Sequence, residues 1–295
     1  MSKFKHIVFP VDYSPRCIGT VVFVKQLART HGSQLTLLYA AEPLPPTYSD
    51  VDVFSTMALY DLDQMRKVGQ SRIENFAGQH FADLATELKV HSLCEPGDAA
   101  LTITGYAQAV GADLIMMATH GYGKFRSLLI GSVTAKVLHD AQCSLWTGAH
   151  MEEAPAHEHV EIRQILCAID LNRTSEDVIQ RAIGMAHTHG AALRIIHSVS
   201  AGDARGERHF EEELRNLIDR ATRGGKAATL AQEVVTEVRT APHHESISKG
   251  VRSAALQHHA DLVVVGRGGV HGSFGRLRTH AYAIIRDSPC PVLSV

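Results

Sequence analysis

The sequence is short of the features that mark several classes of protein. Its formal net charge is only −2, so electrostatics alone would not draw it to nucleic acid or to an anionic membrane. Its five cysteines are scattered, which argues against a disulfide framework, a metal knuckle or a redox dithiol. No apolar run approaches the ~18 residues of a membrane span, and the N-terminal run lacks the cleavage pattern of a secretory signal. We therefore expect a cytoplasmic protein with no nucleic-acid or membrane partner.

The chain contains two copies of one pattern. The segment HIVFPVDYSP, with Asp12, is repeated approximately by QILCAIDLNR, with Asp170, and HGSQLTLLYA is repeated by HGAALRIIHS at the same spacing. Further on, GADLIMMATHG is repeated by HADLVVVGRGG, although the second copy is shorter in its middle. A polar stretch without apolar periodicity separates the copies. We predict two domains, at residues 1–149 and 161–295, joined by a linker at 150–160.

Each copy alternates short apolar runs with longer stretches of helical period. This pattern is typical of βαβ units with a parallel sheet that is covered on both faces. Ser14 and Pro15 form a helix-start signal, and Asn172 takes the matching cap position in the second copy. Both first helices end in His-Gly, where glycine can adopt the left-handed conformation and an imidazole can face the carbonyl end of the helix dipole. The first copy further predicts a loop over Thr47–Phe54, a long second helix over Met57–Leu88, a strand near Val90–Cys94 and a helix over Ala99–Val110 capped by Asp98.

Candidate binding residues fall at the ends of the predicted strands. In an open parallel sheet, ligands bind outside the carboxyl ends of the strands. Asp12 follows the first strand, and its carboxylate could accept hydrogen bonds from ribose hydroxyls or cap the next helix. Ala40 and Ala118 follow the second and fourth strands, where a small side chain leaves room for a flat ring or is an ordinary packing residue.

The pair Gly131-Ser132 stands where a helix is expected to begin. There it would offer unobstructed backbone N–H groups and a hydroxyl, which suits a phosphate chain. A plain serine helix cap is the alternative interpretation.

The spacing of these residues resembles the signature of the ATP-binding universal stress proteins. That signature is Gly, two residues, Gly, nine residues and then Gly-Ser. Here Ala118 stands at the first glycine, Gly121 at the second, and Gly131-Ser132 closes the motif. Asp12 matches the strand-end aspartate of the family, and the resemblance covers nearly the whole chain, twice over.

The resemblance implies a fold and a ligand. The fold is α/β: two tandem flavodoxin-like domains, similar to adenine nucleotide alpha hydrolases, each a five-stranded parallel sheet of order 3-2-1-4-5 with helices on both faces. ATP, together with Mg²⁺, would lie across the ends of strands one and four. Asp12 would meet the ribose, with Pro10 and Ala40 beside the adenine. The phosphates would be lined by Ala118, Gly121, Gly131, Ser132 and Val133.

The second copy departs from the motif. It keeps Asp170, Gly266 and Gly269, but Thr279-His280 stands where the first copy has Gly131-Ser132. A β-branched residue would stiffen the turn and crowd the phosphates, and histidine is bulkier than serine. We therefore expect ATP to bind to the first domain only.

Two functions stay open from the sequence. The first is an ATP-binding regulatory or stress-response protein that hydrolyses ATP very slowly at most. The second is a nucleotide-free scaffold or interaction module of the same fold, with protein partners that the sequence does not name. An enzyme acting on a separate substrate ranks third, because the P-loop, dinucleotide and nucleophile-elbow motifs are all missing.

The nineteen histidines raise the question of a metal site. The adjacent pairs His243-His244 and His258-His259 are poor ligands on their own, because neighbouring side chains on a helix point about 100° apart. We expect no metal centre formed by the protein itself.

The last predicted strand of each copy is short and apolar, and would be an exposed edge. We expect Ser144–Thr147 and Pro291–Val295 to form the contact between two separate sheets, giving an intramolecular pseudo-dimer. A higher homo-oligomer stays open.

Overall fold

The computed structural model describes residues 3–42, 62–119, 130–148, 160–172, 174–200, 207–222, 234–241, 246–267 and 278–295. The first repeat contains β1 (His6–Pro10), α1 (Pro15–His31), β2 (Gln34–Ala41), α3 (Leu62–His80), α4 (Ala82–Ala85), β3 (Val90–Pro96), α5 (Ala99–Ala109), β4 (Leu114–Met116), α6 (Ser132–Asp140) and β5 (Ser144–Thr147). The second repeat contains β6 (Gln164–Ile169), α7 (Ser175–His189), β7 (Ala192–Ser200), α8 (Glu207–Thr222), β8 (Val235–Ala241), α10 (Ile247–Gln257), β9 (Leu262–Val265), α11 (Arg278–Asp287) and β10 (Val292–Ser294). The predicted linker falls almost wholly outside the described residues.

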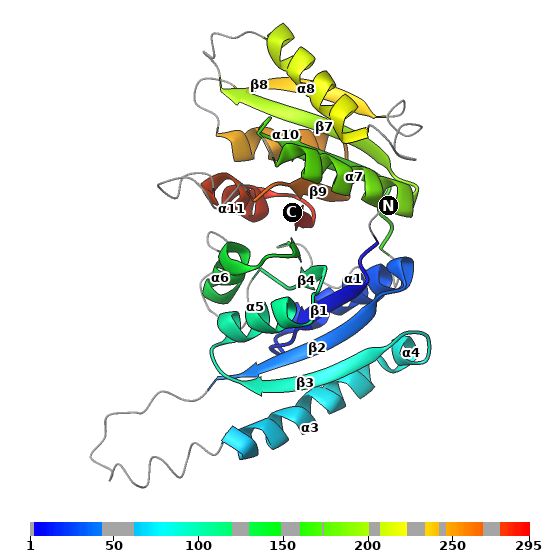
Figure 1. The fold of residues 1–295 in the computed structure, drawn as a ribbon, viewed down its shortest axis with the longest axis vertical. Coiled ribbons are helices and arrows are strands. Elements are labelled where there is room, and N and C mark those ends of the chain that lie inside the picture. The colour runs from blue at the N-terminus through cyan, green and yellow to red at the C-terminus, as the bar shows by residue number, and fades with distance from the viewer. Residues whose placement is uncertain are drawn as a thin grey trace, which may run out of the picture.

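The described strands form one ten-stranded sheet, in the order β3-β2-β1-β4-β5-β10-β9-β6-β7-β8 (Figure 1). Within each repeat, neighbouring strands are parallel and follow the order 3-2-1-4-5, which confirms the predicted fold. In the middle of the sheet, β5 and β10 pair in the antiparallel sense, with Leu293 opposite Trp146. The last strands do meet, but the expectation of two separate sheets is wrong.

The two sheets merge because each repeat would otherwise end in an unpaired edge. Pairing of β5 with β10 satisfies the backbone groups of both edges. The side chains at this seam are as buried as those of a domain core, since Thr147 and Ser294 are 0% exposed and Trp146 is 2% exposed. The Ser294 hydroxyl also donates to the Leu145 carbonyl at 3.2 Å. The junction of β5 and β10 is therefore as well buried as the interior of either repeat.

Two hydrophobic clusters cover the two faces of the sheet, and each runs through both repeats (Figure 1). Strand β1 shows the alternation that assigns side chains to faces, because Ile7 and Phe9 belong to one cluster and Val8 to the other. The first cluster includes residues of α1, α3, α7 and α8, and the second includes residues of α5, α6, α10 and α11. The strand ends that carry the candidate residues thus belong to a sheet that is covered on both faces.

Helix α1 begins and ends as the sequence predicts. Ser14 accepts the N–H of Cys17 at 3.1 Å, and Pro15 is the first helical residue. Gly32 follows α1 with φ of 66°, and Gly190 follows α7 with φ of 64°, the left-handed conformation that glycine adopts without steric cost.

The start of α7 differs from the prediction. Asn172 was expected to cap this helix, but α7 begins at Ser175 and Thr174 precedes it. The Asn172 side chain instead accepts the Thr174 N–H at 2.9 Å, which closes a local turn before the helix.

The predicted long second helix is interrupted. Residues 43–61 lie outside the described residues, so the loop predicted over Thr47–Phe54 and the predicted helix start are not described. The described part divides into α3 and α4 at Phe81, whose side chain is 0% exposed. A buried aromatic ring at this point anchors the break in the hydrophobic core.

The third strand and the helix after it follow the prediction more closely. Strand β3 begins at Val90 as expected and extends two residues past Cys94 to Pro96. Asp98 caps α5 by accepting the N–H of Leu101 at 2.9 Å.

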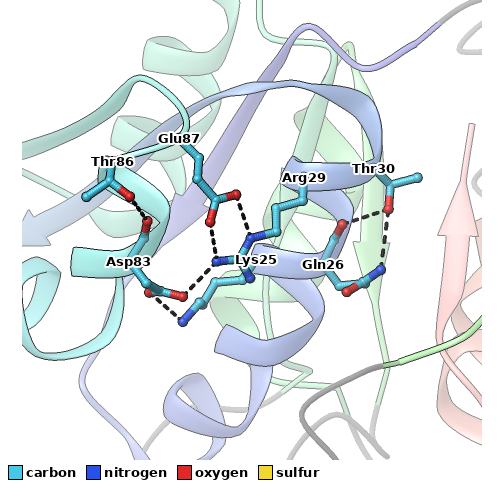
Figure 2. A network of polar contacts seen from close by, with 7 residues as sticks. All are labelled: Lys25, Gln26, Arg29, Thr30, Asp83, Thr86 and Glu87. Carbon is cyan, nitrogen blue, oxygen red and sulfur yellow. Dashed lines mark hydrogen bonds and ion pairs between the residues drawn. The ribbon is translucent and has the colours of Figure 1, made fainter.

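Charged side chains connect α1 to α4 and the turn that follows it (Figure 2). Arg29 donates from Nε to Glu87 at 2.9 Å and from Nη2 to Asp83 at 2.7 Å, and Lys25 approaches Asp83 at 2.7 Å. Partial burial opposes the charged form of Asp83, but hydrogen bonds from Lys25 and Arg29 outweigh it and lower its pKa to about 2. Because solvent reaches these groups and screens their attraction, the pairs add little to stability.

A pair of histidines lies where the first helices of the two repeats approach each other. The ring centroids of His31 and His189 are 5.7 Å apart, and His31 accepts the backbone N–H of Phe4 at its Nδ1, at 3.3 Å. Burial, followed by the proximity of His189, lowers the pKa of His31 from 6.5 to about 4. Burial also lowers the pKa of His189. His31 is therefore neutral at pH 7, and a charge–dipole contribution at this helix end does not arise.

We predict that these histidines make the protein less stable in mild acid. The unfolded chain takes up a proton at His31 near pH 6.5, whereas the folded chain does so only near pH 4. The free energy of unfolding should therefore be highest above pH 6.5 and fall between those values, by up to about 3 kcal/mol for this residue. Denaturant unfolding across this range should show a shallower pH dependence in His31→Asn. The control His187→Asn, at an exposed position of α7, should keep the parent slope, and an unchanged slope in both variants would contradict the assignment.

Candidate functional site

The ends of β1, β2 and β4 meet at one edge of the sheet. Pro10 pairs with Leu38, and the Val11 N–H donates to the Leu38 carbonyl at 2.8 Å. On the other side, β1 is in register with β4. Extended past the last paired residues, these parallel registers point Asp12 toward Ala40 and Val11 toward Ala118. Ala40 and Ala118 are half-buried, and Asp12 is exposed.

Asp12 keeps part of its hydrogen-bonding capacity. Its Oδ1 accepts the Ser14 N–H at 2.9 Å, the Cys17 thiol lies beside the carboxylate, and the side chain is exposed. Ser14, rather than Asp12, caps α1. Burial raises the pKa of the neighbouring Cys17 thiol to about 12, so that thiol adds no negative charge at neutral pH. The Asp12 carboxylate can therefore accept a hydrogen bond from a ligand.

The turn after Asp12 is strained and firmly packed. Tyr13 has φ of 62°, which is uncommon for a residue other than glycine and costs about 1 kcal/mol or more. Its ring contacts Tyr39 and Phe76, with ring centroids 5.0 and 5.6 Å away, and the Arg72 guanidinium lies 4.0 Å from its centroid. Burial raises the pKa of the Tyr13 hydroxyl well above its ordinary value. Leu171, the residue equivalent to Tyr13 in the second repeat, has φ of 56°. Both repeats therefore make the same turn after the first strand.

Helix α6 begins beside the residues that follow β4. Its cap residue is Gly131, as predicted, with φ of −57° and ψ of 149°, and no side chain caps the helix. The Gly131 N–H donates to the Thr119 carbonyl at 2.9 Å, and the Thr134 hydroxyl donates to the Ala118 carbonyl at 3.1 Å. These two bonds fix the helix start to the strand end.

The first turn of α6 is suited to an anion. The N–H groups of Ser132, Val133 and Thr134 are the first of the helix, and an α-helix offers no internal acceptor for such groups. Together with the helix dipole, they favour negative charge at this position. Ser132 is exposed and Val133 half-buried, so a ligand can reach this turn.

The structure brings together most of the residues that the sequence selected. Gly121 lies outside the described residues, as does the rest of residues 120–129. The sequence did not indicate the roles of Thr119 and Thr134. The Thr119 carbonyl accepts the Gly131 N–H and the Thr134 hydroxyl donates to the Ala118 carbonyl, and neither bond leaves a pattern in the sequence. The predicted residues found at this edge are Pro10, Asp12, Ala40, Ala118, Gly131, Ser132 and Val133.

The equivalent edge of the second repeat is organised differently. Asp170 accepts from Asn172 Nδ2 at Oδ2, at 2.8 Å, and from the Ser175 hydroxyl at Oδ1, at 3.2 Å. Each of its oxygens therefore accepts a hydrogen bond from a side chain of the turn before α7 or of its first residue. The cavity at this edge, which Asp170, His280 and Gly266 help to line, has a volume of about 70 Å³. Pockets for small ligands usually hold roughly 300–1,000 Å³, so this one is small for a nucleotide.

The described residues contain no group of three or more His, Cys, Asp or Glu side chains able to hold a metal ion. His258, from one of the adjacent pairs, contacts Glu237 at 3.0 Å, whereas His243 and His244 lie outside the described residues. Within the described parts of the chain, no helix combines the length and apolar character needed to span a membrane.

Comparison with known proteins gives a consistent result. The universal stress protein family matches the chain twice, over residues 3–147 and 161–295. A universal stress protein of Synechocystis sp. is 30% identical over 140 residues, which are 48% of this chain and 82% of that protein. One of Thermus aquaticus is 31% identical over 140 residues, 48% of this chain and 95% of that protein. The crystal structure of a universal stress protein from Archaeoglobus fulgidus has the same fold, with a TM-score of 0.68 and 19% identity, and the match covers 98% of this chain and 95% of that one. The chain therefore belongs to the universal stress protein family, with two domains of that family in tandem.

Proposed function

We propose that the protein binds ATP through its first repeat and acts as a nucleotide-dependent regulatory protein. One observation carries the proposal. An exposed carboxylate, Asp12, stands at the same sheet edge as the start of α6 at Gly131, where no side chain caps the helix. A hydrogen-bond acceptor for a ribose and a cluster of amide donors for phosphates are the two ends of a nucleotide site.

Different residues at this edge would contact different parts of the nucleotide. Asp12 would accept a hydrogen bond from a ribose hydroxyl, and the small surfaces of Pro10 and Ala40 would lie beside the adenine. The amides of Ser132 and Val133 would face the phosphates, and the Ser132 hydroxyl would add a further donor. Mg²⁺ would enter with the phosphates and offset their charge. We assign no protein ligand to it.

The proposal is one of binding, and it distinguishes the two repeats. In the second repeat, Asp170 is already occupied by Asn172 and Ser175, and the cavity beside it is small. The first repeat is therefore proposed as the nucleotide site, and the second as a domain of the same fold that holds no ATP.

Calorimetric titration of the full chain with ATP tests this function. We expect saturable binding in the presence of Mg²⁺ and weaker binding when the metal is chelated, because the phosphates then retain their full charge. Titration with no heat of binding under either condition, supported by the absence of nucleotide in the denatured purified protein, would favour the nucleotide-free scaffold instead.

A further inference from the structure

Helix α6, which carries the proposed phosphate-binding amides, is held at its C-terminal end by the second repeat. Arg267, just after β9, donates from Nη1 to the Ala141 carbonyl at 2.9 Å and from Nη2 to the Cys143 carbonyl at 2.5 Å. Ala141 is the C-cap residue of α6 and Cys143 lies in the short connection to β5, so this guanidinium ties the end of the helix to the second repeat. The Arg267 backbone N–H is itself bound to the Val295 carbonyl at 3.1 Å, which fixes it to the final strand of the chain.

The second repeat also holds the N-terminal end of the same helix. Tyr282, on α11, accepts the N–H of Ile130 at 3.1 Å, and its hydroxyl lies 3.3 Å from the Ile130 carbonyl, to which it can donate. Ile130 immediately precedes the cap residue Gly131, and its side chain is only 6% exposed. Figure 1 shows α11 and α6 facing each other across the junction of the repeats. One hydroxyl from the second repeat thus fixes the backbone that leads into the first turn of α6.

The equivalent positions of the first repeat hold shorter side chains. Thr119 corresponds to Arg267, and Thr134 corresponds to Tyr282. Thr134 hydrogen-bonds within its own repeat, to the Ala118 carbonyl, and a threonine is too short to act as the longer side chain does. The second repeat therefore has long polar side chains that reach into the first, where the first repeat has threonines.

We propose that the second repeat is a positioning domain, which sets the nucleotide affinity of the first repeat by holding α6 at both ends. The inference rests on the proposed function, because it concerns the helix that would bind the phosphates. Tyr282 is the positioning residue: it touches no part of the proposed ligand and acts through Ile130. Any such coupling is reciprocal, so nucleotide bound to the first repeat must in turn stabilise the contact with α11.

The test is Tyr282→Phe in the full chain, which removes the hydroxyl and keeps the ring. Hydrogen exchange of the ligand-free variant should be faster at Ile130 and in the first turn of α6. The affinity for MgATP, measured by calorimetry, should fall about fivefold to tenfold, as expected when a hydrogen bond of ordinary strength is lost. In the parent, ATP should slow exchange in α11, and the variant should lose this response, which a merely structural role of the hydroxyl would not produce.

The matched control is Tyr106→Phe, the same change on α5 of the first repeat, where no described residue hydrogen-bonds to the hydroxyl. It should leave both exchange and affinity at parent values. Unchanged exchange at α6 in Tyr282→Phe would overturn the inference, as would unchanged affinity in a parent that binds ATP. If the parent binds no ATP, the proposed function and the nucleotide coupling both fail, while exchange in the ligand-free variant still decides whether Tyr282 holds the helix.

Discussion

Replacing Gly131 with threonine is expected to weaken ATP binding by roughly 100-fold or more. The new side chain would stand at the cap of α6, where the phosphates are proposed to meet the first amides of the helix. Its hydroxyl can accept an N–H of the first turn, as threonine caps do, and its methyl group would crowd the anion. Losing two charge-assisted hydrogen bonds corresponds to about 3 kcal/mol or more, which is about two orders of magnitude in affinity.

The same change should not harm the fold. Gly131 has φ of −57° and ψ of 149°, which threonine adopts without strain, and the hydroxyl would supply the cap that the helix lacks. Thermal melting of the ligand-free variant should therefore equal or exceed that of the parent. Gly131→Ala, which adds no hydroxyl, should weaken binding less. If Gly131→Thr binds ATP as tightly as the parent, the α6 amides are not the phosphate site.

Replacing Asp12 with asparagine is expected to weaken ATP binding roughly 10–100-fold. A hydrogen bond from a ribose hydroxyl to a carboxylate is charge-assisted and contributes about 1.5–3 kcal/mol. Asparagine keeps an Oδ1 that can accept the Ser14 N–H, so the turn before α1 should be preserved. Because Ser14 is the residue that caps the helix, melting of the ligand-free variant should hardly change.

A matched substitution in the second repeat gives the control for Asp12. Asp170→Asn changes an aspartate whose two oxygens already serve Asn172 and Ser175. It should leave ATP affinity at the parent value. Equal affinity of Asp12→Asn and the parent would remove the ribose role of Asp12, and the family resemblance would then describe the fold alone.

Much of the fold could be predicted because it is local and repeated. Apolar runs, helix-start residues such as Ser14 and helix-end glycines such as Gly32 act through neighbours in the chain, and the repeat supplied a second reading of the same pattern. The sequence predicted that the two last strands meet, because both are short apolar edges, but it did not predict that they pair into one sheet. The antiparallel register that sets Leu293 opposite Trp146 depends on how two edges far apart in the chain are oriented in space.

The candidate site shows the same difference between local features, which the sequence predicts, and contacts between distant residues, which it does not. Asp12 and Gly131 were found because a carboxylate after a strand and a glycine before a helix have chemical meaning wherever they occur. The bond from Tyr282 to Ile130 could not be foreseen, because it joins residues from different repeats and the tyrosine belongs to no motif. The break at Phe81 was missed for a related reason: the polar pattern on either side continues a helix, and only burial of the ring shows where the chain turns.

The central claim is that one chain holds one nucleotide, in the first repeat. Its most direct test is the stoichiometry of the calorimetric titration of the full chain with MgATP. We predict a value near one per chain, unchanged in Asp170→Asn. A value near two would show that the second repeat binds ATP despite its occupied aspartate, and a value near zero would show that the fold is present without the nucleotide site.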